Sequence, residues 1–294
     1  MKQQLALASL RLFSLLPLGI ARLFGRLLGA IMVRLSTQPY RIAKLNIALC
    51  LPELSEQEVA NLAAQRMSHF GQALFETPGL WRRSSAWLQT KILGIEGEDC
   101  LREALDNDRG TIILIPHQGN WEVLGLWLAQ QAQMTSLFQP PKLPLIGKWI
   151  KHARQRTGAA LVPTNVRGVA ALLKALQRGE MTAILPDQQP PAAGGEFAPL
   201  FGSQALTMTL PHNLLKRSSA QIIFACALRE QGGWRLHFFQ PQQAIYSSDV
   251  AMSLSAMNRD IEAVANLAPD QYQWEYKRFR ARPDGSPNIY PKRM

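Results

Sequence analysis

Thr111-Ile-Ile-Leu-Ile115, followed directly by Pro116-His-Gln-Gly-Asn-Trp-Glu122, is the stretch of sequence that decides the fold. Its first part is a short run of β-branched and apolar residues, which is typical of a strand buried on both faces. Gly119 and Asn120 then supply a tight turn and a helix N-cap, so a helix is expected to begin at Trp121. A buried strand that leads through a short loop into a helix is the repeating unit of parallel α/β sheets.

The same alternation continues along most of the chain. Apolar runs predict strands over 92–95, 111–115, 135–138, 160–162, 181–185, 221–228 and 234–239. Helical patterns fall at 98–105, 121–131, 144–156, 166–178, 205–217 and 250–267, and earlier helices are expected after 36–39 up to Leu51 and from the capping box at 55–58 to about Phe75. The expected fold class is therefore α/β, with a central, mainly parallel sheet covered by helices and a single domain over 36–294.

Residues 1–35 have a different texture, because they are rich in apolar residues and contain basic residues but no acid. Their longest uncharged stretch, 12–21, is much shorter than the roughly 20 residues that a membrane-spanning helix needs. Arg11, Arg22 and Arg26 share one helical face, and leucines and isoleucines occupy the other. We therefore expect an N-terminal amphipathic, membrane-anchoring helix over 1–35. A tilted span with snorkelling arginines, or a core-packing helix whose arginines face water, are the alternatives.

The net charge of +11 is concentrated at the two ends of the chain. Residues 1–52 hold seven basic residues and no acid, and residues 276–294 hold six basic residues and one acid, which leaves 19 basic against 20 acidic residues between them. This distribution favours a membrane surface or an acidic partner over nucleic acid, for which no helix-turn-helix, finger or RNP pattern is present. The three cysteines are widely spaced, which excludes a disulfide framework and a CxxC metal site.

His117 is the candidate catalytic residue, because it directly follows a predicted strand at the edge where α/β sheets bind ligands. Glu122, in the first turn of the next helix, can fold back toward His117. A carboxylate that holds one imidazole nitrogen fixes the tautomer and raises the basicity of the other, as a general base requires. The backbone amides of 119–121 and the Asn120 side chain are candidate donors to an oxyanion. The alternative is a turn histidine bonded to backbone, with Glu122 paired to the helix dipole.

Several further motifs occur in one order along the chain. They are Arg41-Ile-Ala-Lys-Leu-Asn46, Leu51-Pro-Glu-Leu-Ser55, the 117–122 motif, Arg154-Gln-Arg-Thr-Gly158, Leu173-Lys-Ala-Leu-Gln-Arg-Gly179, Asp187-Gln188, Phe197-Ala-Pro-Leu-Phe-Gly202, and Pro269 with Trp274-Glu-Tyr-Lys-Arg-Phe-Arg-Ala-Arg-Pro283. Over nearly its whole length the chain thus resembles the lipid A biosynthesis (lauroyl/myristoyl-type) acyltransferases, within the wider H-x4-D/E acyltransferases. Glu rather than Asp at 122 favours the lipid A branch. Tyr276 departs from the family, which usually has His at this place.

The resemblance implies an enzyme, an O-acyltransferase that moves a fatty acyl chain from acyl carrier protein to a hydroxyl of a lipid A precursor. His117 would be the general base and Glu122 its orienting carboxylate, with no metal and no cofactor besides the acyl-carrier donor. The resemblance places this work at the cytoplasmic face of the inner membrane of a Gram-negative bacterium. It leaves the oligomeric state open.

Six residues are expected to bind substrate: Asn120, Arg154, Arg156, Asp187, Lys277 and Arg278. The guanidinium groups of the two arginines near 155 suit phosphate, and Asp187 follows a predicted strand and could orient an arginine or a sugar hydroxyl. The basic pair at 277–278 could bind acceptor phosphates or anionic lipid. The alternatives are solvated arginines at a helix end, a turn-capping Asp and a solvated basic tail.

Two other functions compete with this interpretation. One is a related acyltransferase that uses another lipid or glycan acceptor, or acyl-CoA as donor, because a histidine base activates any well-placed hydroxyl. The other is a membrane-bound lipid-binding protein without chemistry.

Overall fold

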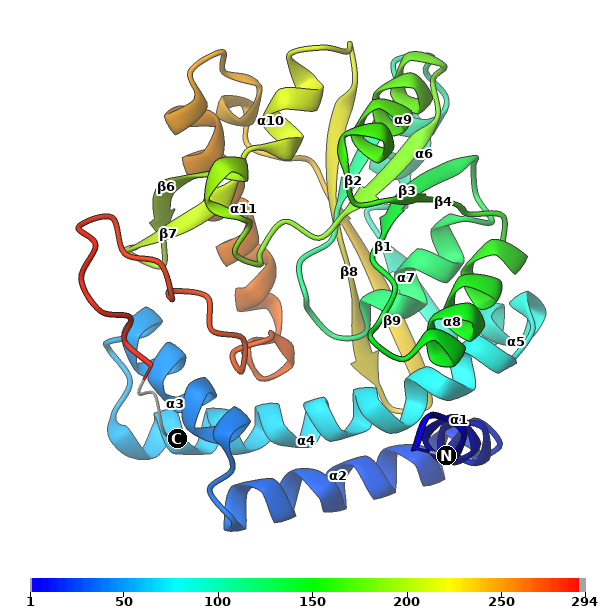
Figure 1. The fold of residues 1–294 in the computed structure, drawn as a ribbon, viewed down its shortest axis with the longest axis vertical. Helices are drawn as coiled ribbons and strands as arrows, with labels where there is room; N and C mark the ends of the chain where they lie inside the picture. The colour runs from blue at the N-terminus through cyan, green and yellow to red at the C-terminus, as the bar shows by residue number, and fades with distance from the viewer. Residues whose placement is uncertain (1, 291–294) are drawn as a thin grey trace.

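A twisted seven-stranded sheet runs through the centre of the molecule, in the order β1-β9-β8-β2-β5-β3-β4 (Figure 1). This computed structural model describes residues 2–290; Met1 and residues 291–294, which include Lys292 and Arg293, lie outside the described residues. The strands are β1 (Ile92–Glu96), β2 (Thr111–Leu114), β3 (Met134–Phe138), β4 (Ala160–Pro163), β5 (Met181–Ile184), β8 (Gln221–Glu230) and β9 (Gly233–Phe239). Neighbouring strands pair in parallel except β8 and β9, which form an antiparallel hairpin. The predicted mainly parallel sheet is confirmed.

The central strand β2 is buried on both faces, as its composition requires. It pairs with β5 on one side and with β8 on the other. Ile112 and Leu114 contribute to one apolar core, and Ile113 and Ile115 contribute to a second core on the opposite face. The alternation of side chains along a strand therefore feeds both layers of the molecule.

The helices cover both faces of this sheet. They include α5 (Ser85–Gln89), α6 (Glu98–Leu105), α7 (Trp121–Leu128), α8 (Pro144–Arg156), α9 (Val166–Gln177), α10 (Leu210–Leu215) and α11 (Val250–Leu267). Buried residues of α9 and α11 belong to the first core, and those of α6 and α7 to the second. The predicted helices over 98–105, 144–156 and 250–267 agree with the structure, and α7 and α9 end within a turn of their predicted ends.

The helix predicted over 205–217 is wrong in its first part. Residues 195–208 form an antiparallel hairpin of β6 (Gly195–Leu200) and β7 (Ser203–Met208), and only α10 remains helical. Phe201 and Gly202 both have positive φ angles, 47° and 71°, and this left-handed pair turns the chain back on itself. Pro211, in the first turn of α10, favours a helix that starts after the hairpin.

The amino-terminal segment is two helices rather than the one expected over 1–35. α1 (Lys2–Phe13) and α2 (Leu18–Arg34) are separated at Pro17, whose ring and missing N–H interrupt a continuous helix. α3 (Gln38–Cys50) and α4 (Glu56–Arg82) follow, and the capping box of Ser55 and Glu58 is confirmed at the start of α4. α4 continues beyond Phe75, the predicted end.

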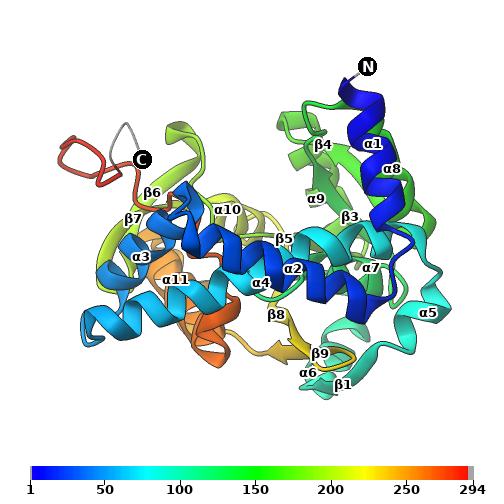
Figure 2. The ribbon, with the colours of Figure 1, turned by 90° about the horizontal axis from the view of Figure 1, so that it is seen from below.

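α2 lies along α4 with the two backbones in direct contact (Figures 1 and 2). A Cβ atom added to Gly25 would lie 2.4 Å from the backbone of Gln72, and one added to Gly71 would lie 2.0 Å from the carbonyl oxygen of Gly25. Glycine at these positions is therefore what permits the close approach, as in small-residue helix packing elsewhere.

This packing corrects the prediction for one of the three arginines. Arg22, expected on an outward polar face, is buried against α4 with 6% exposure. The predicted apolar face is directed outward, with exposed Leu5, Leu12, Leu15, Ile20, Leu23, Phe24, Leu27, Ile31 and Leu35 along α1 and α2. In residues 2–290, none of the helices combines the length and the hydrophobicity needed to cross a bilayer. Membrane anchoring by this segment stays a prediction.

Candidate active site

His117 and Asp187 follow two neighbouring strands at equal distances. β2 and β5 pair in parallel, and the last pair in their register joins Leu114 to Ile184. Each of the two polar residues comes three positions later, at the same edge of the sheet. The Nδ1 atom of His117 lies 2.7 Å from Oδ1 of Asp187, and the backbone N–H of His117 donates to Oδ2 over 2.7 Å. Parallel register thus brings together two residues that are 70 positions apart.

The Asp187 carboxylate determines which nitrogen of His117 is available. Asp187 is 4% exposed. Burial by itself raises the pKa of Asp187, but the charge and hydrogen bonds of His117 outweigh burial and hold this pKa below its ordinary value. An ionised carboxylate accepts hydrogen bonds only, so the proton of His117 sits on Nδ1. The Nε2 atom is then left with a lone pair, which is the state that a general base needs.

Gln188 and Gln273 border the free nitrogen. The Gln188 amide nitrogen lies 3.1 Å from His117 Nε2 and donates to the Gln273 side-chain oxygen over 3.0 Å. The two hydrogens of this amide match these two acceptors. A hydroxyl that came to Nε2 would take the place of the Gln188 amide, which would then be free to bind another oxygen nearby.

The predicted contact between Glu122 and His117 is wrong. Glu122 is 2% exposed, and its two oxygens accept hydrogen bonds from Nε and Nη2 of Arg154, at 3.0 and 2.8 Å. The indole N–H of Trp81 donates to the same carboxylate over 2.9 Å. Because α7 begins at Trp121, Glu122 points from its first turn toward α4 and α8, whereas His117 points along the sheet edge to Asp187.

Trp121 lies between the hydrogen-bonded His117–Asp187 pair and the Glu122–Arg154 ion pair. Its ring lies edge-on to the His117 ring, with centroids 5.9 Å apart, and the Arg154 guanidinium lies 5.2 Å from the Trp121 centroid. The pKa of Arg154 is raised, because the charge and hydrogen bonds of Glu122 outweigh a burial that acts to lower it. Arg154 is therefore a fixed cation within the protein. Its Nη1 group has no acceptor among the described residues, so phosphate binding by Arg154 stays a prediction.

Asn120 is also occupied. Its side-chain oxygen caps α7 by accepting from the amide of Glu122 over 3.2 Å, and its side-chain nitrogen donates to Glu76 over 2.8 Å. The backbone amides of Gly119 and Asn120 donate to the carbonyls of Gln271 and Ala227. Of the predicted oxyanion donors in 119–121, only the Trp121 amide has no acceptor among the described residues.

Glu76 holds the loop that contains the 117–122 motif. It is 2% exposed and accepts from Asn120, from Arg22 over 2.9 Å and from Arg229 over 2.7 Å. Arg229 also donates to the carbonyl of Gly119 over 3.2 Å. Burial raises the pKa of Glu76, but the two guanidinium charges outweigh it and lower the pKa. The loop is thus tied to α2, α4 and β8 at once.

Arg156, another expected phosphate ligand, does not reach this site. Its guanidinium donates to the backbone carbonyls of Arg82 and Arg83, at 3.3 and 2.5 Å, at the end of α4. The side chain is exposed and helps to join α8 to α4. The described contacts of Arg156 are therefore those of a helix-joining residue.

The carboxy-terminal basic pair divides between two surroundings. Arg278 is 5% exposed and donates to the carbonyl of Leu206 over 2.7 Å and to the Thr207 hydroxyl over 3.2 Å. Burial lowers its pKa. Lys277 lies over the Tyr290 ring, 5.7 Å from its centroid. The alternative of a solvated basic tail is wrong for Arg278, because its side chain is buried and anchors the hairpin of β6 and β7. Substrate binding by Arg278, which lines a pocket together with Asp187, stays a prediction.

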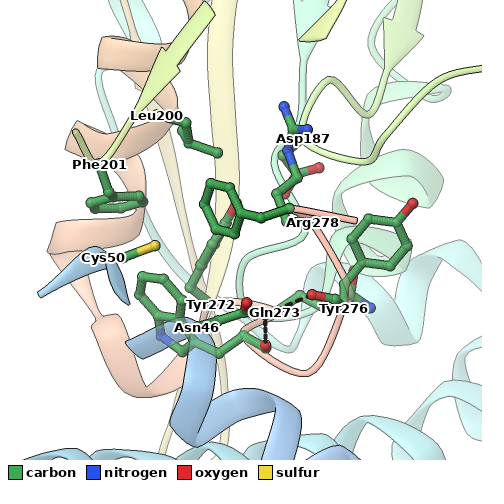
Figure 3. Close-up of a pocket in the computed structure, with 11 residues that line it drawn as sticks. Asn46, Cys50, Asp187, Leu200, Phe201, Tyr272, Gln273, Tyr276 and Arg278 are labelled. Carbon is green, nitrogen blue, oxygen red and sulfur yellow. Dashed lines mark hydrogen bonds between the residues drawn. The ribbon is translucent and has the colours of Figure 1, made fainter. Parts of the chain in front are cut away.

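Figure 3 shows Arg278 and Tyr276 beside Asp187 in the lining of a pocket. Its empty volume is about 320 Å³ when its opening to solvent is included. Asn46 of α3 holds this part of the chain, since its side-chain nitrogen donates to the carbonyls of Trp274 and Tyr276 at 2.6 and 2.7 Å. The Tyr276 hydroxyl accepts from the backbone N–H of Gln189 over 3.1 Å. The residue at the family's usual His position therefore lies within the site and supports the loop after Asp187.

Sequence reasoning missed Gln188 as a contact of His117, and it missed Glu76, Trp81 and Arg229 altogether. Gln188 carried one available signal, because it directly follows Asp187 in a matching motif. The other three lie on α4 and β8, where apolar periodicity shows only that the elements exist. Their convergence on one loop is a consequence of packing.

The fold and this site define a class of protein. It is an α/β enzyme with a histidine–carboxylate pair at the carboxyl edge of a mainly parallel sheet, where one imidazole nitrogen is free to take a proton.

Comparison with known proteins identifies the family within this class. The family profile described as bacterial lipid A biosynthesis acyltransferase matches residues 2–281. The chain belongs to this family and is an acyltransferase of the late, secondary-acylation type.

Three relatives from Escherichia coli (strain K12) illustrate the range of the family. The lipid A biosynthesis palmitoleoyltransferase is 29% identical over 94% of this chain and 90% of its own length. The lauroyltransferase is 28% identical over 94% and 90%, and the myristoyltransferase is 25% identical over 93% and 84%. These names differ in the acyl group transferred, so the size of the acyl group varies among similar sequences.

Proposed function

We propose that this enzyme transfers a fatty acyl chain from acyl carrier protein to a hydroxyl of a lipid A precursor, with His117 as the general base. The observation that carries the proposal is the 2.7 Å hydrogen bond from His117 Nδ1 to Asp187, which leaves the lone pair on Nε2. There Nε2 accepts from the Gln188 amide, which an acceptor hydroxyl would displace. The family of the chain and the names of its relatives support the acceptor class.

The reaction needs no covalent enzyme intermediate. His117 Nε2 removes the proton of the acceptor hydroxyl as its oxygen attacks the thioester carbonyl carbon. The carbonyl oxygen becomes an oxyanion, for which the Trp121 amide and the displaced Gln188 amide are the available donors. The C–S bond then breaks as the C=O bond reforms, and the imidazolium returns its proton to the departing thiolate. Asp187 stabilises that imidazolium throughout.

Glu122 has a supporting role in this scheme. It fixes Arg154, and Arg154 in turn holds Trp121 against His117. Glu122 would thus affect the reaction by positioning the His117 ring, without contacting it.

The outer face of α8 is suited to the acidic donor protein. Lys142 in the preceding loop and Lys148 and Lys151 on the helix are exposed, and α8 contains no acid. Arg154 extends from the same helix into the site. A carrier protein bound at these lysines would bring its thioester close to His117.

The apolar outer face of α1 and α2 supports work at a membrane surface. Arg11, Arg26 and Arg34 are exposed among the outward leucines and isoleucines of these helices. Apolar side chains with basic neighbours and no acid match the boundary of an anionic bilayer. The inner membrane of a Gram-negative cell, at its cytoplasmic face, is the membrane that we propose.

The test is transfer by the purified full-length protein, with acyl-carrier thioester and tetra-acylated lipid A precursor. We expect H117A and D187N each to lower kcat/KM by roughly 10²-fold or more, since both remove general-base function. Arg102 is exposed on α6 and not on α8, so R102A is the control and keeps wild-type activity.

Each other result has a distinct meaning. Transfer that survives in both H117A and D187N contradicts the mechanism. A wild type that is inactive here but active with acyl-CoA, or on a phospholipid or glycan, selects the related acyltransferase instead. Lipid binding without any transfer contradicts the acyl-transfer proposal as a whole.

A further inference from the structure

Gly125 is a helical glycine that neither packing nor backbone conformation requires. It lies inside α7, one turn after Trp121, among buried apolar neighbours. A Cβ atom added there would have no atom within 4 Å, whereas a Cβ on Gly119 would lie 2.0 Å from the carbonyl oxygen of Ala227. Glycine in a helix interior weakens the helix relative to alanine. The missing side chain therefore leaves space that the surrounding protein does not fill.

That space belongs to a pocket between the sheet, α7 and α8, whose empty volume is about 490 Å³ when its opening to solvent is included. Besides the Glu122–Arg154 pair and Ser136, the residues that line it are glycine or apolar, including Met134, Leu137 and Leu161. The two helices are joined at this pocket by the hydrogen bonds of Arg154 on α8 to Glu122 on α7. An apolar cavity with one polar wall suits an alkyl chain that carries a polar head group.

The cavity begins at the catalytic edge of the sheet. Ile115 and Leu185 line it, and each precedes a member of the His117–Asp187 pair by two residues. At the far end it reaches Met134, whose register partner is Met181 at the start of β5. The distance from that level to Leu185 is four residues along a strand, or about 13 Å. A thioester carbonyl beside His117 would therefore have its alkyl chain directed along β5 beneath α7.

We infer that this cavity holds the transferred acyl chain and that the absence of a side chain at Gly125 determines how long a chain the enzyme accepts. The inference rests on the proposed acyl transfer. Gly125 lies four residues, about 6 Å along the helix, below Trp121 at the entrance, so a larger residue there blocks the deeper part of the cavity.

The experiment compares wild type, G125A and G125L with saturated acyl-carrier thioesters from octanoyl to palmitoyl. In G125L, kcat/KM for long chains falls by about tenfold or more relative to short chains, because each methylene that no longer fits costs roughly this factor. G125A shows a smaller shift in the same direction. Its melting temperature equals or exceeds that of wild type, so it remains informative if G125L folds poorly.

The control is A170L, which adds apolar bulk at an exposed position of α9 and keeps the wild-type chain-length profile. A G125L enzyme that is folded and active with an unchanged profile overturns the inference while leaving the proposed function intact. The same conclusion follows if A170L and G125L shift the profile equally.

A binding measurement separates the inference from the proposed function. Calorimetric titration with palmitate and with octanoate is carried out on the same proteins in the absence of acceptor. The expected result is that G125L binds palmitate about tenfold more weakly than wild type, or weaker still, and binds octanoate as well as wild type. This result supports the inference that the cavity holds the acyl chain, even if wild type transfers no chain. Equal palmitate affinity in wild type and G125L overturns it, whatever the transfer assay shows.

Discussion

At the scale of single residues, three buried carboxylates and the groups that they bind hold the site together. Asp187 binds His117, and Glu122 binds Arg154. Glu76 accepts hydrogen bonds from three side chains, those of Arg22, Arg229 and Asn120. Only the first pair includes a group that can take up the acceptor proton. The other two hold cations whose burial would otherwise be costly, and through them they fix the loop that carries His117.

Glu76 provides a stability prediction at this scale. In E76A, two buried guanidinium groups lose their counter-charge, so the free energy of unfolding falls by about 3–5 kcal/mol. E76Q retains hydrogen-bonding capacity and loses less. The measurement is urea unfolding followed by tryptophan fluorescence.

The control for Glu76 is Glu98, which pairs with Arg102 on the exposed surface of α6. E98A should change the free energy of unfolding by no more than about 1 kcal/mol. If E76A and E98A lowered the free energy of unfolding equally, the buried ion pairs of Glu76 would contribute no more to stability than the exposed pair of Glu98.

At the scale of secondary-structure elements, α2 is a helix with two apolar faces of different kinds. One face carries Gly25 and Gly29 and packs directly on the α4 backbone. The other carries larger residues such as Leu23 and Leu27, which are 45% and 52% exposed. Sequence periodicity detected the large apolar residues and assigned them to a buried or lipid-facing side. It did not detect that glycines would form the surface that packs inside the protein.

The outward face of α2 is tested by the double substitution L23E/L27E. Because neither side chain is buried in the protein, the variant should fold normally, while binding to vesicles that contain anionic phospholipid weakens by roughly tenfold or more. Sedimentation of the protein with such vesicles measures the effect. Val166 on α9 is 86% exposed, so V166E is the control that retains vesicle binding. Binding that is equal in wild type and L23E/L27E would contradict a lipid-facing role.

At the scale of the whole molecule, partly or fully buried histidines link stability to pH. Burial is the largest cause that lowers the pKa of His69, and likewise that of His212 and His237. His69 stays neutral while it accepts from Arg229 through Nδ1 and donates to Asp270 through Nε2. Below the ordinary histidine pKa of 6.5 the unfolded chain therefore binds more protons than the folded protein does.

The resulting prediction is that the free energy of unfolding falls as the pH decreases from about 6.5. The stability contribution is complete above the unfolded pKa and is lost as the pH falls toward the lowered pKa of each histidine. The slope is at most about 1.4 kcal/mol per pH unit for each histidine. The lowered pKa values of Asp187 and Asp270 add a loss of the same sign only below about pH 3.8.

Urea unfolding at pH 7.5, 6.5 and 5.5 measures this slope. In H69Q, whose amide can make both hydrogen bonds without titrating, the slope should be smaller. A free energy of unfolding that is constant or rises as the pH decreases through this range would contradict the prediction.

Much of the fold could be predicted because the relevant signals are local. The run of 111–115 is a buried strand wherever it lies, and Ser55 with Glu58 caps a helix through contacts only three residues apart. The hairpin of β6 and β7 was missed because its short strands carry helix-compatible apolar residues. The turn at Phe201 and Gly202 makes this segment a hairpin, and it depends on left-handed backbone angles that composition does not reveal.

The sequence predicted which residues belong to the candidate site better than it predicted which of them contact each other. His117, Glu122, Arg154 and Asp187 do lie together around Trp121. Their pairing was assigned by closeness in sequence, which favoured the residue five positions from His117 over one 70 positions away. Parallel register reversed that choice, because it aligns residues at equal distances beyond neighbouring strands.

The sequence by itself determined most of the helices and strands of the central sheet, the strand that leads to His117 and the polar residues that follow strand ends. These features depend on periodicity and on contacts within a few residues. Tertiary structure alone decided that Asp187 holds His117, that Glu122 holds Arg154 and that Arg22 is buried. The physical reason is that a buried charge must be neutralised by whichever group the packed elements bring within reach, and that group has no fixed distance along the chain.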